Sequence, residues 1–201
     1  MTSCGPEKAA VLAVEDGPFS KSDRRCVLVG VVTSGTGVGR VVVDRILVDG
    51  TDATDKIAGF GDQLERLDLI MLPSISLGGF NIVDPFKLSS MSKRPVLVAN
   101  PARPHLAAVR NALKAHFRDW KKRYRVFELM GSPTTLRLGS EGRIYFYPVG
   151  LSSIAARKIL RPLVRLGKTP EPLRVAKLIA RGLSDPSFLE GLRRVGHQCR
   201  D

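Results

Sequence analysis

The stretch AAVLAVEDGPF, residues 9–19, decides the fold prediction because it has the pattern of a strand that ends in two adjacent acids. Its apolar first half is typical of a strand buried on both faces, and a Gly-Pro pair indicates a turn after Glu15 and Asp16. Residues 24–34 and 40–50 follow as two β-branched runs with glycines between them, which predicts a hairpin. The chain therefore begins with three consecutive strands, an antiparallel meander.

Strands and helices then alternate along the chain. We expect a helix within residues 51–67, strands at 69–72 and 94–100, a helix at 104–124, strands at 124–131 and 142–150, and helices at 151–167 and 170–184. Asp52 or Thr54 can cap the first of these helices. This order predicts an α/β fold, a ribonuclease H-like mixed sheet with flanking helices. We expect a single domain over residues 1–201, with a mobile tail over about 185–201.

Positive charge is concentrated in the second half of the chain. Residues 1–100 contain 11 basic and 12 acidic side chains, whereas residues 101–201 contain 21 basic and 7 acidic ones. Because neutralising phosphates releases condensed counterions, such a surface favours a polyanion, and we expect a nucleic acid, DNA or RNA, as the partner. The alternative is a general basic bias of the organism's proteins.

The spacing of the cysteines and the lengths of the apolar stretches indicate the compartment in which the protein works. Cys4, Cys26 and Cys199 lie far apart and match no zinc-site or disulfide spacing. No stretch approaches the roughly 18 uninterrupted apolar residues that a membrane helix needs, and we expect no membrane association. These features predict a cytoplasmic protein with reduced thiols.

The basic segment RDWKKRYR, residues 118–125, is the main candidate for nucleic-acid contact. It combines Arg118, Lys121, Lys122 and Arg123 with Trp120, a composition suited to phosphate contacts and base stacking. The same pattern also suits a helix end whose cations complement the helix dipole while the tryptophan packs inward.

Arg103, which directly precedes the helix expected at residues 104–124, is a further candidate for nucleic-acid binding.

The stretch DLIMLPSISLGGFNIVD, residues 68–84, begins as a buried strand and continues into a glycine-rich loop. In an α/β enzyme a strand of this kind often presents an acid at its end, and here Pro73 and Ser74 follow instead. Gly78 and Gly79 allow main chain to approach a flat ring closely, since no Cβ intervenes.

Six segments in order carry a resemblance to a known family. They are VLAVEDGPF, VDGTDAT, IMLPSISLGGFNIVD, RPVLVANP, YPVGLSSIAARKIL and PEPLRVAKLIA. Together they resemble the archaeal domain-of-unknown-function-ninety-nine family, which is associated with an activity named endonuclease dU and is related to endonuclease V. The resemblance spans about residues 9–183.

The resemblance implies an endonuclease V-like fold and metal-dependent nicking of DNA at or near deaminated bases, deoxyuridine or inosine, in DNA repair. The catalytic acids are then Glu15, Asp16 and Asp52. Glu15, Asp16, Asp49 and Asp52 are the candidate ligands of Mg²⁺ or Mn²⁺. Which of the two neighbouring acids faces the metal is left open.

The resemblance also assigns the glycine-rich loop to a base pocket. Gly78, Gly79, Phe80 and Asn81 are similar to a loop that helps to form the pocket of endonuclease V, where the base is turned out of the stack. The alternative is a structural turn with Phe80 tucked into the core.

Two positions depart from the family pattern. Members of the family tend to have aspartate and glycine where this chain has Pro73 and Ser74, and endonuclease V has a histidine where this chain has Leu151. Neither proline nor serine can replace the charge of a carboxylate, and Mg²⁺ affinity depends on the number of converging anionic oxygens.

Two functions therefore compete. One is a metal-dependent endonuclease, and the other is a catalytically impaired nucleic-acid-binding protein on the same fold. A third alternative, an interaction subunit that never meets nucleic acid, has less support.

Overall fold

The computed structural model describes residues 9–35, 37–64, 66–139 and 142–185. In chain order the elements are β1 (Ala10–Asp16), β2 (Arg25–Ser34), β3 (Gly37–Leu47), α1 (Ala53–Asp62), β4 (Leu69–Leu72), β5 (Ser76–Leu77), β6 (Asn81–Ile82), α2 (Pro85–Ser92), β7 (Val96–Asn100), α3 (Leu106–His116), α4 (Trp120–Met130), β8 (Thr134–Arg137), β9 (Arg143–Val149), α5 (Ser153–Leu163) and α6 (Glu171–Leu183). The tail expected over about 185–201 lies outside the described residues from residue 186 onward.

Seven strands form one mixed sheet in the order β3-β2-β1-β4-β7-β9-β8. β1, β2 and β3 form the expected antiparallel meander, whereas β1, β4 and β7 run parallel to one another. β9 returns antiparallel to β7 and carries β8 at the far edge. The prediction of a mixed α/β sheet with flanking helices is confirmed.

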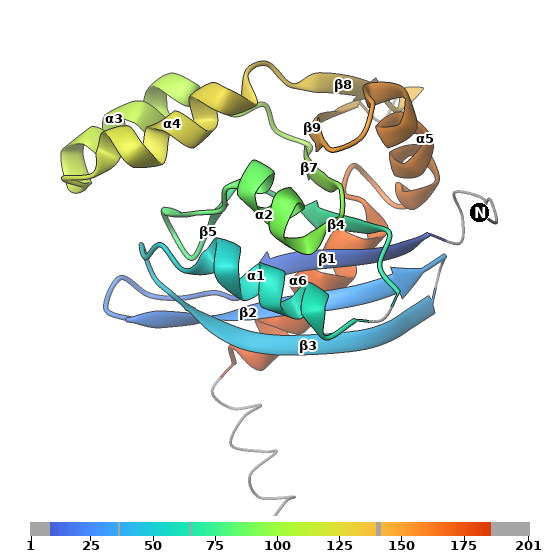
Figure 1. Ribbon diagram of the computed structural model, residues 1–201, viewed down its shortest axis with the longest axis horizontal. Coiled ribbons are helices and arrows are strands. Elements are labelled where there is room, and N and C mark those ends of the chain that lie inside the picture. Colours follow the sequence, from blue (N-terminus) through green and yellow to red (C-terminus); the bar gives the residue numbers. More distant parts are fainter. Residues whose placement is uncertain (1–8, 36, 65, 140–141, 186–201) are drawn as a thin grey trace, which may run out of the picture.

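Helices cover both faces of the sheet, as Figure 1 shows: α1 and α2 lie in front of it and α6 lies behind. The alternation of β1 explains both layers, because its neighbouring side chains point to opposite faces. Leu12 and Val14 belong to the core under α1 and α2, and Val11 and Ala13 belong to the core under α6. The buried first strand was therefore correctly predicted from its unbroken apolar run.

The helix and strand boundaries expected between residues 104 and 131 were wrong. The expected single helix is two, α3 and α4, because the chain is extended at Phe117. The expected strand at 124–131 is instead the second half of α4, where Tyr124 and Phe127 lie about one turn apart and stack on each other. α3 and α4 pack side by side at one end of the molecule (Figure 1).

No helix within the described residues is long and apolar enough to cross a membrane.

Candidate functional site

The carboxyl ends of the three parallel strands meet at one edge of the sheet. β1 ends at Glu15 and Asp16, β4 leads into Pro73 and Ser74, and β7 ends at Asn100. The Asn100 side-chain amide donates to the Pro73 carbonyl at 3.0 Å, which ties the two strand ends together. Ligands of open α/β sheets bind outside the carboxyl ends of the strands, so we consider this edge the candidate site.

Glu15 lies on the α6 face of the sheet and is only 8% exposed. Burial, together with the nearby charge of Asp16, raises the pKa of Glu15 to about 7, while Lys177 and Arg181 on α6 act in the opposite direction. β1 pairs with β4 as far as Ala13 and Met71, and β4 ends one residue later at Leu72. Pro73 therefore lies just beyond the strand, at the same edge of the sheet as Glu15.

The raised pKa of Glu15 predicts how stability depends on pH. A carboxyl whose pKa moves from 4.5 to about 7 on folding favours the folded state at low pH, and this contribution is lost as the pH rises through 7. The full loss corresponds to roughly 3 kcal/mol. We expect Glu15→Gln to lose less stability than the parent between pH 5 and pH 8, as measured by urea unfolding. Glu128→Gln, at an exposed position, is the control and should keep the pH dependence of the parent. Equal slopes of unfolding free energy against pH for Glu15→Gln and the parent would contradict the raised pKa of Glu15.

Asp16 points to the opposite face of the sheet from Glu15. Its Oδ2 accepts a hydrogen bond of 2.8 Å from the backbone N–H of Gly78. Burial raises the pKa of Asp16, and this hydrogen bond opposes the shift. The two predicted acids are thus neighbours in sequence but do not converge, and Asp16 fastens the glycine-rich loop.

Asp49 holds the same loop from the other side. Its backbone N–H donates to the Gly78 carbonyl at 2.8 Å, and its Oδ1 accepts from the Phe80 N–H at 2.8 Å. Gly79 has φ +82°, and a Cβ there would lie 2.3 Å from the Asp49 carboxylate oxygen. A glycine is therefore required by the packing of the loop against Asp49.

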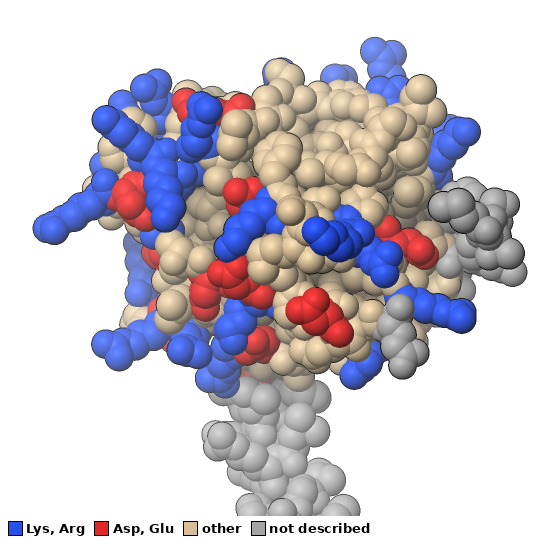
Figure 2. Space-filling model, in the orientation of Figure 1, with Lys and Arg blue, Asp and Glu red and all other residues tan. Residues whose placement is uncertain are grey.

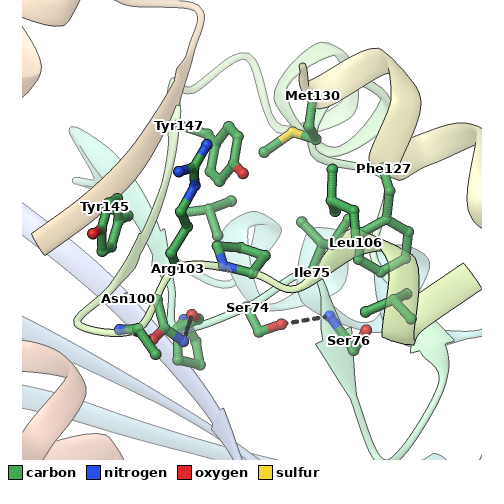
Figure 3. Close-up of a pocket in the computed structure, with 15 residues that line it drawn as sticks. Ser74, Ile75, Ser76, Asn100, Arg103, Leu106, Phe127, Met130, Tyr145 and Tyr147 are labelled. Atoms are coloured by element: carbon green, nitrogen blue, oxygen red, sulfur yellow. Dashed lines mark hydrogen bonds between the residues drawn. The ribbon is translucent and has the colours of Figure 1, made fainter. Parts of the chain in front are cut away.

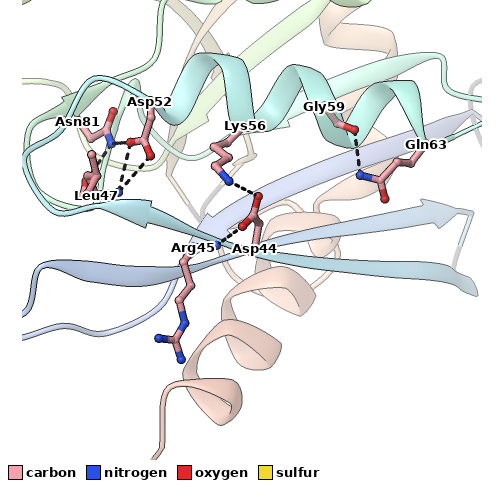
Figure 4. A network of polar contacts seen from close by, with 8 residues as sticks. All are labelled: Asp44, Arg45, Leu47, Asp52, Lys56, Gly59, Gln63 and Asn81. Carbon is pink, nitrogen blue, oxygen red and sulfur yellow. Dashed lines mark hydrogen bonds and ion pairs between the residues drawn. The ribbon is translucent and has the colours of Figure 1, made fainter.

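Asp52 and Asn81 form a buried polar network at the start of α1 (Figure 4). The Asn81 side chain is fully buried, and its amide donates to the Asp52 carboxylate at 2.6 Å and to the Leu47 carbonyl at 2.9 Å. Its Oδ1 accepts from the Ala53 N–H, so a residue 28 positions away caps the helix. The Asp52 side chain accepts from the Leu47 N–H and makes no capping bond of its own.

The loop at residues 78–81 therefore packs against the core of the protein. Phe80 packs edge-on against Phe117 at 5.5 Å, and Gly78 and Asn81 are buried against the core. The structure follows the alternative of a structural turn, and the base-pocket role of residues 78–81 stays a prediction.

The arrangement of the acidic side chains decides whether they can hold Mg²⁺ or Mn²⁺. Among the described residues no three or more His, Cys, Asp or Glu side chains are grouped so as to hold a metal ion. The acids that flank the loop are engaged elsewhere: Asp68 accepts from the Ala10 N–H, and Asp84 caps α2. This donor set does not fit the compact carboxylate cluster that such an ion prefers.

An apolar pocket of about 320 Å³ lies beside the ends of β4 and β7 (Figure 3). Its walls are Pro73, Ser74, Ile75, Ser76, Val98, Asn100, Ala102, Arg103, Pro104, Leu106, Val109, Phe127, Met130, Tyr145 and Tyr147. The pocket was missed at the sequence level because four separate segments build it. The alternation of Tyr145 and Tyr147 in β9 was the one available signal, since both side chains point to the same face.

A group of exposed cations covers the outside of the two helices that close the pocket. This α3–α4 basic surface consists of Arg110, Lys114, Arg118, Lys121, Lys122 and Arg125. Figure 2 shows the corresponding blue side chains gathered at the α3–α4 end of the molecule. Trp120 is half-buried beneath them, with the ammonium groups of Lys114 and Lys121 4.9 and 5.8 Å from its ring centre.

Arg123 departs from its predicted role. Its side chain is 10% exposed and turns inward, where Nη1 donates to the carbonyls of Gly50 and Phe80. The guanidinium also lies 4.4 Å from the Phe117 ring centre and is paired with Asp119. Arg123 therefore joins α4 to the glycine-rich loop and is not available to a phosphate. Arg103, in contrast, is exposed at the pocket.

Comparison with known proteins gives relatives of similar length. A UPF0215 protein of Thermococcus gammatolerans is 42% identical over 177 residues, which cover 85% of this chain and 89% of the relative. A crystal structure of a protein of unknown function from Archaeoglobus fulgidus has a TM-score of 0.76 at 32% identity, covering 86% of this chain and 96% of that one.

A more distant structural likeness is to endonuclease V. The Ciona intestinalis enzyme, in complex with a 23mer DNA containing an inosine, has a TM-score of 0.55 at 10% identity and covers 84% of this chain and 82% of that one. The endonuclease V-like fold predicted from the sequence is thus confirmed.

The sequence pattern of one family, described as Endonuclease dU, matches residues 7–184, nearly the whole chain. This protein belongs to the endonuclease dU family.

Proposed function

We propose that this protein binds DNA at deaminated bases and that its own acidic residues do not complete a metal-dependent cleavage centre. The observation that carries the proposal is the α3–α4 basic surface beside the pocket. The same two helices present cations outward and line the pocket inward, through Leu106 and Val109 of α3 and Phe127 and Met130 of α4. Phosphate contacts can therefore position a strand next to an apolar cavity.

The pocket suits a base that has left the stack. Tyr145 and Tyr147 offer aromatic surface to a flat ring, and the Ser74 hydroxyl, which accepts from the Ser76 N–H, can still donate to its edge. Extruding a base from the stack costs a few kcal/mol, and the cost is lowest for a damaged or mispaired base. Such a pocket therefore favours damaged or mispaired bases over normal ones. In this proposal the base is recognised next to Pro73 and Ser74, whereas the base-pocket role of residues 78–81 stays a prediction.

Metal-dependent nicking is the second candidate function. The family and the presence of Glu15 and Asp16 at the end of β1 favour it. Against it stand the opposite directions of these two side chains and the proline that follows β4 at this edge of the sheet. Binding needs only the cations and the pocket, whereas cleavage needs several acids that converge.

Removing part of the α3–α4 basic surface tests the proposal. We expect a variant with Arg118, Lys121 and Lys122 all replaced by alanine to bind a deoxyuridine-containing oligonucleotide about 100-fold more weakly at moderate salt, with a salt slope shallower by about 2 to 3. Gel shifts over a range of salt concentrations measure both quantities.

A matched variant checks that total charge does not explain the effect. Alanine at Arg157, Lys158 and Arg161, three exposed cations of α5 at the other side of the molecule, removes the same charge and should change binding little. Equal losses in both triple variants would contradict the placement of the interface. If the unsubstituted protein gives no gel shift even at low salt, it does not bind this DNA, and the alternative of an interaction subunit that never meets nucleic acid is favoured.

A further inference from the structure

The outer edge of the sheet, at β3, has features of an interface. β3 is the end strand of the seven-stranded sheet and is eleven residues long. On the face behind the sheet, α6 packs on β1 and β2, and Val41, Val43 and Leu47 of β3 are 41%, 53% and 39% exposed. A long edge strand with exposed apolar side chains offers its unpaired backbone groups to another strand.

The sequence of β3 is complementary to itself about Val42. In an antiparallel pair of two copies related by a two-fold axis at Val42, Arg40 faces the partner's Asp44, and Val41 faces the partner's Val43. Arg40 and Asp44 lie on one face of the strand and the two valines on the other, so charges meet charges and apolar side chains meet apolar side chains.

Neighbouring registers lack this match. A two-fold axis at Asp44 sets that residue against its own copy, and like charges directly opposite each other are destabilising. An axis at Val43 sets Asp44 against a valine. The bulge at Gly39, where the pairing of β3 with β2 shifts between Val38 and Arg40, lies outside the five residues that pair about Val42.

We propose that β3 is a self-association surface, on which a second copy of this chain adds its own β3 antiparallel about Val42 to form a continuous sheet across a dimer. The charges involved are accessible. The Asp44 side chain is 39% exposed although it also pairs with Lys56, and Arg40 is exposed although one of its N–H groups donates to the Gln63 carbonyl. The interface lies at the sheet edge opposite to β8, so the pocket and the α3–α4 basic surface stay free.

Charge-reversal variants and their mixture test the proposal. We expect the full chain to be a dimer in analytical ultracentrifugation at about 100 µM, and Arg40→Asp or Asp44→Arg to raise the dimer dissociation constant by about tenfold or more. An equimolar mixture of the two variants should dimerise again, because each like-charge pair becomes an opposite-charge pair. This recovery cannot be produced by variants that have merely failed to fold.

Arg45→Asp provides the matched control, since it makes the same charge change on the same strand but faces Gly39 in the proposed register. It should leave the dimer intact. A monomeric unsubstituted chain at about 100 µM would overturn the proposal and leave the strand to another occupant, such as residues 186–201 of the same chain. A dimer that neither charge reversal weakens, or a mixture that does not recover, would also overturn it.

Discussion

Replacing Pro73 by aspartate and Ser74 by glycine is expected to raise the rate of metal-dependent nicking at least ~100-fold above that of the parent protein. Residue 73 follows β4 at the same edge of the sheet as Glu15, so the new carboxylate adds anionic oxygens to that edge. The variant should also show a rise in melting temperature with Mn²⁺, which the parent should not show, because a bound ion stabilises only the folded chain. Nicking of a labelled deoxyuridine-containing strand measures the first effect.

Two controls accompany this variant. Ser74→Gly alone adds no carboxylate and should stay inactive, and Glu15→Gln in the double variant should remove the new activity. If the parent protein nicks as fast as the double variant, Pro73 does not impair the site.

Asn81→Ala is expected to destabilise the protein by about 3 kcal/mol or more, because a fully buried side chain with three hydrogen bonds is removed. The change leaves the buried Ala53 N–H, the partly buried Leu47 carbonyl and one Asp52 oxygen without this partner. Guanidinium unfolding measures the loss of free energy. Asn111→Ala, at an exposed position of α3, should change stability by no more than about 0.5 kcal/mol. Equal midpoints for both variants would show that Asn81 does not hold the loop to α1.

The fold could be predicted from the sequence because its strongest signals are local. The buried run of β1, the hairpin of β2 and β3, and the apolar periodicity of α5 and α6 each lie within a short segment. The boundary between α3 and α4 could not be placed, because Tyr124, Val126 and Phe127 are common in strands and the packing that selects a helix comes from other segments. Tertiary contact outweighed local preference there.

The roles of the acids depended on contacts that sequence spacing does not contain. Asp16, Asp49 and Asp52 lie in segments that suit metal ligands, yet their partners are the main chain of the glycine-rich loop and the Asn81 amide, 29 or more residues away. Arg123 lies in the same basic segment as Lys121 and Lys122. It turns inward because the glycine-rich loop presents the Phe80 carbonyl to it. Residue type predicted which side chains are polar, but not which of them are already engaged.

The most direct test of the account is one titration of the full-length protein with a fluorescent deoxyuridine-containing oligonucleotide in the presence of Mn²⁺, followed by both anisotropy and gel analysis. We expect salt-sensitive binding that favours the deaminated base over its normal counterpart, with the strand left intact. Metal-dependent nicks that disappear in Glu15→Gln or Asp16→Asn would contradict it, because the acids of this chain would then form a working centre.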